Sequence, residues 1–335
     1  MKGLVVGGGS AGRNYLLAGA TLGHSMYLHE LDLRKSDDLK QEIHELTLVS
    51  QLENYESTFD YIVISTTADS HLEIAKTAVA LNPKYLVVEK LLTNNLSELD
   101  ALASLQESNP NVRFRSHNRW KLLGVTSGIS QLSEKFDLGQ LISFSSIGGA
   151  MCLASGAVHW LSSLNELVAL ETGEFELSGK LKFSLQEKRP KFDTAHGAMQ
   201  FQIGGKQIRF EYSELSRVTP VQLLLFEEGQ ISLTFSGEYQ VFRNNLPKLG
   251  SLRKYDLAVM CDQGNLIVGS NNPFEILLHS LGGDCSDPLD FQGSVRANEL
   301  ILLAMQLSHK RKLTHLDLQS TRLNSNSYRK SWRIT

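Results

Sequence analysis

The residues whose spacing points most directly to chemistry form a glycine-rich run near the start of the sequence. Gly7, Gly9 and Gly12 give the pattern G-x-G-x-x-G, with Ser10 and Ala11 between the last two glycines. Glycines at these positions let the backbone turn tightly, approach a pyrophosphate and pack a following helix against the preceding strand. The free N–H groups of that helix would receive the phosphates. The run predicts a dinucleotide site, and the alternative is a purely structural turn.

An acidic residue is expected about 20 positions later, where it would accept hydrogen bonds from the adenosine ribose. Glu30 closes the apolar run 25–29 and is the best-placed candidate; Asp32 follows it. A carboxylate here repels a 2′-phosphate, so NAD is favoured over NADP, although Arg34 could offset that repulsion. The alternative is a solvated, charged turn.

Polar side chains follow two further apolar runs. Thr66 and Thr67 end the run 60–67, and Lys90 comes shortly after the run 84–88. Ligands of parallel sheets bind outside the carboxyl ends of the strands, so these side chains are predicted to face the same crevice as the glycines.

The elements that must position these residues change character along the chain. Over residues 1–115, apolar strands alternate with amphipathic helical stretches, which predicts an α/β, doubly wound parallel sheet of the Rossmann type. After this, a helical connection, a strand and a helix lead into alternating strands and two late helices. This predicts an α+β domain with a mostly antiparallel open sheet. The predicted domains are 1–120, 121–310 and a basic C-terminal tail at 311–335.

One strand of the second domain, 223–226, is apolar on both faces. Such a strand must be covered on both sides, by helices or by another subunit. We therefore expect a homodimer or homotetramer.

Composition narrows the class of protein. A net charge of −3 over 335 residues argues against a partner nucleic acid. The three cysteines form no C-x-x-C pair, which argues against a zinc site or a disulfide framework, and we expect no metal. No apolar stretch is long enough to cross a membrane, so we expect a cytoplasmic protein.

Several motifs follow one another in an order typical of one enzyme family. The glycine run is followed by S-T-T-A-D-S-H at 65–71, Glu89 with Lys90, Asn118 with Arg119, and His159. Together they resemble the Gfo/Idh/MocA oxidoreductases, the glucose–fructose oxidoreductase and inositol dehydrogenase type. The resemblance implies hydride transfer between a nicotinamide cofactor and a hydroxyl of a sugar, polyol or sugar derivative.

The resemblance also implies roles for individual residues. Cofactor binding extends to Ser65, His71 and Glu89. Lys90 and His159 are expected to be the catalytic residues. The side chains expected to contact the substrate are those of Asn118, Arg119, Ser155 and Trp160.

Oxidation of an alcohol requires removal of the hydroxyl proton as well as of the hydride. Histidine titrates near neutral pH, so His159 is the expected base, while a cationic Lys90 would polarise the oxygen. The alternatives are structural: Lys90 on the surface, His159 packed in a helix beside Trp160, and Asn118 with Arg119 in a hydrogen-bonded turn.

Three positions depart from the family pattern. Leu91 replaces the proline of E-K-P, Ser155 replaces the acid of D-x-x-x-H, and Ser162 replaces a second acid. These losses keep two other functions open. One is a redox-neutral sugar-modifying enzyme with tightly bound NAD, and the other is a non-catalytic protein that binds NAD or a sugar.

Overall fold

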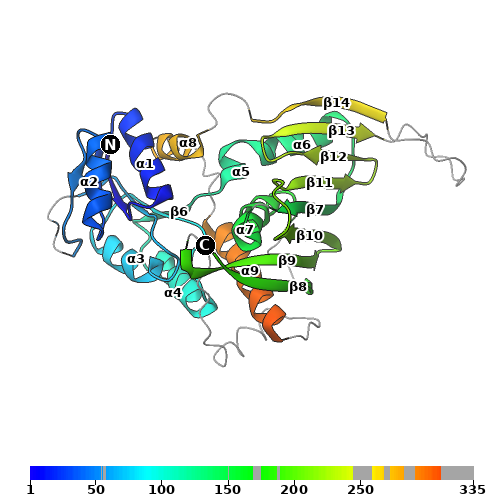
Figure 1. Ribbon diagram of the computed structural model, residues 1–335. Helices are drawn as coiled ribbons and strands as arrows, with labels where there is room; N and C mark the ends of the chain where they lie inside the picture. The colour runs from blue at the N-terminus through cyan, green and yellow to red at the C-terminus, as the bar shows by residue number, and fades with distance from the viewer. Residues whose placement is uncertain are drawn as a thin grey trace, which may run out of the picture. The chain divides into compact units, whose positions relative to one another are not determined.

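The structure is a computed structural model that describes residues 1–53, 55, 58–149, 151–168, 175–186, 189–243, 259–267, 272–282 and 291–310. The chain divides into two compact units. The first comprises Met1–Leu122 together with Asn272–Leu302, and the second comprises Leu123–Asn271 together with the described residues from Leu303 onward. Figure 1 shows the elements of both units along the chain. The predicted basic tail at 311–335 lies outside the described residues.

The first unit contains a six-stranded sheet in the order β3-β2-β1-β4-β5-β6, and every described pair of strands is parallel. Its strands are β1 (Lys2–Val6), β2 (Ser25–His29), β3 (Thr47–Leu48), β4 (Tyr61–Ile64), β5 (Tyr85–Val88) and β6 (Arg113–Ser116). The helices are α1 (Ser10–Thr21), α2 (Leu33–Glu42), α3 (His71–Ala80), α4 (Leu96–Glu107), α5 (Arg119–Leu122) and α8 (Pro273–Ser280); α9 (Phe291–Lys310) begins in this unit. The predicted doubly wound parallel sheet is confirmed.

Local sequence explains why these elements form. All residues of β4 and β5 are buried, as expected for apolar strands covered on both faces. Side chains cap the N-termini of several helices: Asp32 accepts from the backbone N–H of Arg34 at α2, and Asn95 accepts from that of Glu98 at α4. Strand order reverses between β1 and β4, which is where a doubly wound sheet binds its ligands.

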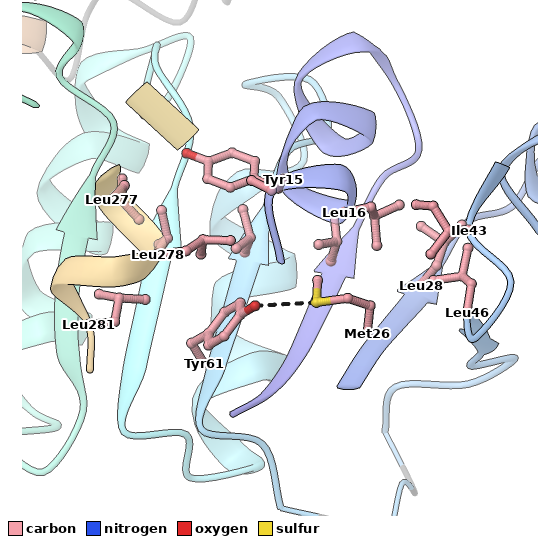
Figure 2. Packing of buried hydrophobic residues seen from close by; sticks show 14 of the residues in the cluster. Tyr15, Leu16, Met26, Leu28, Ile43, Leu46, Tyr61, Leu277, Leu278 and Leu281 are labelled. Carbon is pink, nitrogen blue, oxygen red and sulfur yellow. Dashed lines mark hydrogen bonds between the residues drawn. The ribbon is translucent and has the colours of Figure 1, made fainter. Parts of the chain in front are cut away.

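The chain returns to the first unit at α8. Leu277, Leu278 and Leu281 join a buried cluster that includes Tyr15 and Leu16 of α1 (Figure 2). Helices α1 and α8 pack side by side (Figure 1). The sequence-based division kept 121–310 in the second domain, whereas the structure groups Asn272–Leu302 with the first. An amphipathic helix shows that it has an apolar face, but not which core that face will contact.

The second unit contains an eight-stranded sheet in the order β14-β13-β12-β11-β7-β10-β9-β8. Its strands are β7 (Leu141–Gly149), β8 (Phe175–Gln186), β9 (Arg189–Ile203), β10 (Lys206–Ser213), β11 (Val221–Phe226), β12 (Gly229–Leu233), β13 (Glu238–Arg243) and β14 (Val259–Asn265). Helices α6 (Val125–Lys135) and α7 (Leu153–Leu164) belong to this unit. Among the described strand pairs of this second sheet, only β7 and β10 are parallel. The predicted, mostly antiparallel sheet is confirmed.

The two faces of β11 differ in burial. Leu224 and Phe226 are buried in the unit, whereas Leu223 and Leu225 are each 40% exposed. Val221 on the same strand pairs with Ile147 of β7, and both are also exposed. The apolar strand 223–226 is therefore covered on one face by its own chain and open on the other.

Candidate functional site

The glycine run forms a tight loop between β1 and α1. Gly7 has φ +98°, a conformation that favours glycine, and its backbone N–H donates to the carbonyl of His29 over 2.9 Å. A Cβ on Gly12 would collide with the carbonyl oxygen of Gly7, so only glycine lets α1 begin this close to the loop. By contrast, nothing lies within 4 Å of a Cβ built on Gly9. The first and third glycines are therefore needed by the fold, and Gly9 leaves open space beside the loop.

The N-terminus of α1 has the features of an anion site. Gly9 is its N-cap, and no side chain caps the helix. The earliest intrahelical bond runs from the N–H of Arg13 to the carbonyl of Gly9, so the N–H groups of Ser10, Ala11 and Gly12 precede the helical ladder. Ser10 is exposed and Ala11 is half-buried. Phosphate at this end would meet free donors and the positive end of the helix dipole.

Glu30 is held at the edge of this loop. Its Oε2 accepts a 2.6 Å hydrogen bond from the N–H of Gly8, and its Oε1 accepts a 2.9 Å bond from the N–H of Asp32. Each carboxylate oxygen retains a second lone pair, which a hydroxyl could use. The side chain of Arg34 is exposed, and its backbone N–H donates to Asp32 at the start of α2.

The segment after β4 supports the loop from within. The Ser65 hydroxyl lies 2.9 Å from the carbonyl oxygen of Gly7 and 3.1 Å from that of Val6, so it secures the loop through the backbone. Thr66 is half-buried and Thr67 is exposed. A Cβ on Gly7 would lie 2.8 Å from Cγ2 of Thr66, which places Thr66 directly beside the loop.

His71 is 1% exposed at the start of α3. Its Nδ1 lies 3.1 Å from the carbonyl oxygen of Leu92, and its Nε2 lies 3.1 Å from that of Thr66. Burial lowers the pKa of His71, against the two carbonyl contacts, which raise it. Both ring nitrogens face backbone carbonyl oxygens, and the proposed role of His71 in cofactor binding remains a prediction.

Glu89 lies in a buried network at the carboxyl end of β5. Its Oε1 accepts a 2.8 Å hydrogen bond from the Tyr15 hydroxyl and lies 3.2 Å from Nδ1 of His117. The Tyr15 hydroxyl also lies 3.0 Å from Nδ1 of His117, and both rings pack edge-on against Phe274 of α8. Burial raises the pKa of Glu89, but the charge and hydrogen bond of His117, the charge of Lys90 and the hydrogen bond from Tyr15 together lower that pKa to about 2.

Lys90 follows immediately and is half-buried. Its backbone N–H lies 3.3 Å from Oε2 of Glu89, and the Lys90–Leu91 peptide bond is cis. Lys90 and Glu89 were predicted from the sequence, whereas Tyr15 and His117 were not. His117 stands directly before Asn118 in the sequence, which was the available signal.

Asn118 and Arg119 have structural contacts in the first unit. Oδ1 of Asn118 accepts from the N–H of Trp120 at 3.1 Å and caps the short helix α5. The Arg119 guanidinium lies 5.5 Å from the centroid of the Trp120 ring, and burial lowers the pKa of Arg119. These contacts match the hydrogen-bonded turn considered as the alternative, and the proposed substrate role remains a prediction.

The remaining predicted residues lie on α7 in the second unit. His159 and Ser155 are half-buried, and the Ser155 hydroxyl donates to the carbonyl of Cys152 over 3.2 Å. Trp160 is 2% exposed, and the centroid of its ring lies 5.0 Å from that of Phe144. The indole of Trp160 therefore lies in the core of its unit, and its proposed contact with substrate remains a prediction.

The described part of the chain contains neither a metal-binding cluster nor a membrane-spanning helix. No group of three or more His, Cys, Asp or Glu side chains is arranged to hold a metal ion there. None of the helices described is both long and apolar enough to cross a membrane.

Comparison with known proteins finds likeness in structure but not in sequence. No family model matches the chain, and no curated protein is similar to it in sequence. An oxidoreductase from Agrobacterium radiobacter, solved with NAD+, L-tartaric acid and magnesium, is 15% identical with a TM-score of 0.71, covering 96% of this chain and 99% of that one. A levoglucosan dehydrogenase solved with NADH and levoglucosan is 15% identical with a TM-score of 0.71, covering 94% and 99%.

A third similar structure is the biliverdin reductase of Synechocystis, solved with biliverdin and NADP+. It is 13% identical with a TM-score of 0.69 and covers 91% of this chain and 98% of the other. At these identities the likeness shows a shared fold over nearly the whole chain. The three proteins bind unlike substrates, so the fold does not identify a substrate.

Proposed function

We propose that the chain is a divergent Gfo/Idh/MocA-type oxidoreductase that transfers a hydride between NAD and a hydroxyl of a sugar, polyol or sugar derivative. The observation that carries this proposal is the position of Glu30, whose carboxylate is bound by the N–H of Gly8 at the edge of the glycine loop. An anchored carboxylate beside an uncapped helix N-terminus supplies both parts of a dinucleotide site, one for ribose hydroxyls and one for phosphate. The similar structures solved with NAD+, NADH or NADP+ support the same cofactor class.

The residues of the first unit fit a nicotinamide dinucleotide. The N–H groups at the start of α1 would hold the pyrophosphate, and the open space beside Gly9 admits it without a side-chain clash. Glu30 would accept the hydroxyls of the adenosine ribose through its remaining lone pairs. Thr66 and Thr67 follow β4 next to the loop and would line the path toward the nicotinamide. When bound, the nicotinamide supplies the hydride acceptor or donor.

Lys90 would act on the oxygen of the substrate. It leaves the carboxyl end of β5, the neighbour of β4 in the sheet, and its backbone is joined to the buried Glu89. An ammonium group here would stabilise the negative charge that develops on the substrate oxygen. We propose His159 of the second unit as the residue that takes the hydroxyl proton. Asn118 and Arg119 remain proposed substrate contacts.

Binding measurements test the cofactor before any substrate is known. Calorimetric titration should show tighter binding of NAD than of NADP, because the Glu30 carboxylate repels a 2′-phosphate. The variant Glu30→Gln should narrow or reverse that preference. If NADP binds as tightly as NAD to the parent protein, Glu30 does not discriminate between the two cofactors at the ribose. A panel of sugars, polyols and hydroxy acids, followed by NADH absorbance, then tests the reaction.

One observation favours a second function. Ser155 stands where the family carries an acid, and its hydroxyl is used in a local bond to Cys152. Position 155 therefore supplies no carboxylate to stabilise a protonated His159. A redox-neutral enzyme or a binding protein could function without that carboxylate. NAD that stays bound through gel filtration without net NADH formation would favour the redox-neutral enzyme. Binding of NAD and a sugar without turnover would favour the binding protein.

We also propose that the protein is a homo-oligomer. The open face of the second sheet carries Ile147, Val221, Leu223 and Leu225, each between 40% and 52% exposed. These residues lie on neighbouring strands that pair Val221 with Ile147, so they form a contiguous surface. A second copy of the chain would remove this apolar area from water.

A further inference from the structure

The backbone of Leu92, two residues after Lys90, is held on both sides by buried side chains. Its N–H donates a 2.9 Å hydrogen bond to Oδ1 of Asn298 on α9, and its carbonyl oxygen lies 3.1 Å from Nδ1 of His71 on α3. Asn298 is itself anchored, because its Nδ2 donates to the carbonyl of Ser294 over 2.8 Å. Leu92 is fully buried, and His71 and Asn298 are each 1% exposed. Both polar groups of one peptide residue are thus fixed by side chains distant in sequence.

His71 makes a second contact that extends this anchor. Its other ring nitrogen, Nε2, lies 3.1 Å from the carbonyl oxygen of Thr66, in the segment that follows β4. Thr66 in turn lies against Gly7 in the glycine loop. One imidazole therefore joins the segment after β4 to the segment after β5. A neutral imidazole donates to only one of these carbonyls, and an imidazolium donates to both.

The residue before Lys90 is fixed as well. The carboxylate of Glu89 accepts from Tyr15 and lies against His117, inside the buried network at the end of β5. Lys90 consequently has one anchored residue directly before it and another, Leu92, two residues after it. A side chain between two fixed backbone points loses less conformational entropy on reaching one orientation.

We propose that His71 and Asn298 are positioning residues that set the location of the Lys90 amine by fixing the backbone of Leu92. The decisive contact is the one between Nδ1 of His71 and the carbonyl of Leu92. The contact between Nε2 and Thr66 holds the neighbouring segment. The inference depends on the proposed function for its purpose, since Lys90 is the residue proposed to act on substrate, but its test requires neither cofactor nor substrate.

Two substitutions at position 71 separate the contacts. An asparagine amide nitrogen is two bonds from Cβ, like Nδ1 of histidine, so His71→Asn can still donate to Leu92 but not to Thr66. A glutamine amide nitrogen is three bonds from Cβ, like Nε2, so His71→Gln can still donate to Thr66 but not to Leu92. Each variant keeps a donor for one carbonyl and removes the ring atom that faces the other, and a purely structural role predicts no difference between the two variants in the environment of the Lys90 amine.

The readout is the environment of the Lys90 amine in the protein without ligands. Lysines are labelled by reductive methylation with ¹³C, and the Lys90 resonance is assigned by its absence in Lys90→Arg. In His71→Asn the resonance should stay at its parental position. In His71→Gln it should move toward that of Lys76, an exposed lysine on α3. The thermal unfolding temperature of both variants measures the loss of stability separately from any displacement of the Lys90 amine.

Three results would overturn the inference: the Lys90 resonance moves equally in both variants, it moves in neither, or it moves only in His71→Asn. A second pair of variants tests the same proposal if a His71 variant does not fold. Asn298→Ala removes the acceptor for Leu92, whereas Asn109→Ala removes a comparable asparagine contact to the carbonyl of Leu105 at the end of α4. Only Asn298→Ala should displace the Lys90 resonance, and an unmoved resonance in that variant contradicts the proposal. Failure of NAD to bind in the separate titration would count against the proposed function and not against this positioning role.

Discussion

The hydroxyl of Tyr15 on α1 donates a 2.8 Å hydrogen bond to Oε1 of Glu89 at the end of β5. His117, which follows β6, lies 3.2 Å from the same oxygen. Three segments far apart in the sequence therefore meet at one carboxylate, next to Lys90. Because the network is buried, its removal or protonation should be measurable as a change in stability.

The first prediction concerns the charge of Glu89. Its folded pKa of about 2 lies below its ordinary value near 4.5, so the stability it contributes is fully present above about pH 4.5 and is lost as the pH falls toward 2. At neutral pH Glu89→Gln should lower the free energy of unfolding by on the order of 3 kcal/mol. Urea unfolding of both proteins at about pH 6 and about pH 3 measures the difference, which should shrink at the lower pH. An equal difference at the two pH values would show that Glu89 does not hold a charge in the folded protein.

The second prediction separates two glycines of one loop. Gly12→Ala should destabilise the protein by about 1–3 kcal/mol, because its Cβ would collide with Gly7. Gly9→Ala should change stability by less than about 1 kcal/mol, since its Cβ would meet open space. Yet Gly9→Ala should weaken NAD binding about tenfold or more, because a bound pyrophosphate would meet the added methyl group. Thermal unfolding without ligand and calorimetry with NAD provide the two readouts; unaltered NAD affinity in Gly9→Ala would mean that phosphate binds elsewhere.

The third prediction concerns Lys90. Lys90→Met keeps much of the apolar stem and deletes the charge, so folding and NAD affinity should change little. Turnover of a verified substrate should fall about 10²–10⁴-fold, which corresponds to about 3–5 kcal/mol of activation free energy. Steady-state kinetics and NAD titration of the same preparation test this. Activity within a few-fold of the parent would exclude a catalytic role for Lys90.

The fourth prediction concerns the open face of the second sheet. Leu223→Glu places a charge in its centre and should convert the oligomer to a monomer of about 37 kDa. Leu215→Glu is the matched control, because Leu215 is 89% exposed in the turn after β10, beyond the strand pairs that form the apolar surface. Light scattering gives the molar mass of all three proteins. A monomeric parent protein would contradict the prediction at once.

The sequence predicted those features that depend on short stretches of chain. The apolar runs of β4 and β5 identify buried strands, and the spacing from Gly7 to Glu30 follows from the geometry of a single βαβ unit. The network of Tyr15, Glu89 and His117 was missed because its members come from three separate segments and nothing local marks them as partners.

The orientation of helices was not predicted for the same physical reason. Which face of α7, the helix of Trp160, meets the sheet is decided by packing against residues such as Phe144. The apolar face of α8 was visible in the sequence, while its partner core in the first unit was not. Contacts between distant segments depend on the whole fold, so short-range patterns do not specify them.

The return of the chain at α8 has a consequence for how the protein is synthesised. Residues 1–122 leave the ribosome well before α8 and the start of α9, which contribute Leu277, Leu278 and Asn298 to the same unit. Until translation has passed this point, the α1 surface that α8 covers, including Tyr15, and the backbone N–H of Leu92 lack their final partners. Most of the second unit, from Leu123 to Asn271, emerges in the interval and can begin to fold earlier, and only its segment from Leu303 is translated after α8. A nascent chain stalled before residue 272 should therefore expose part of the first unit's apolar surface to chaperones.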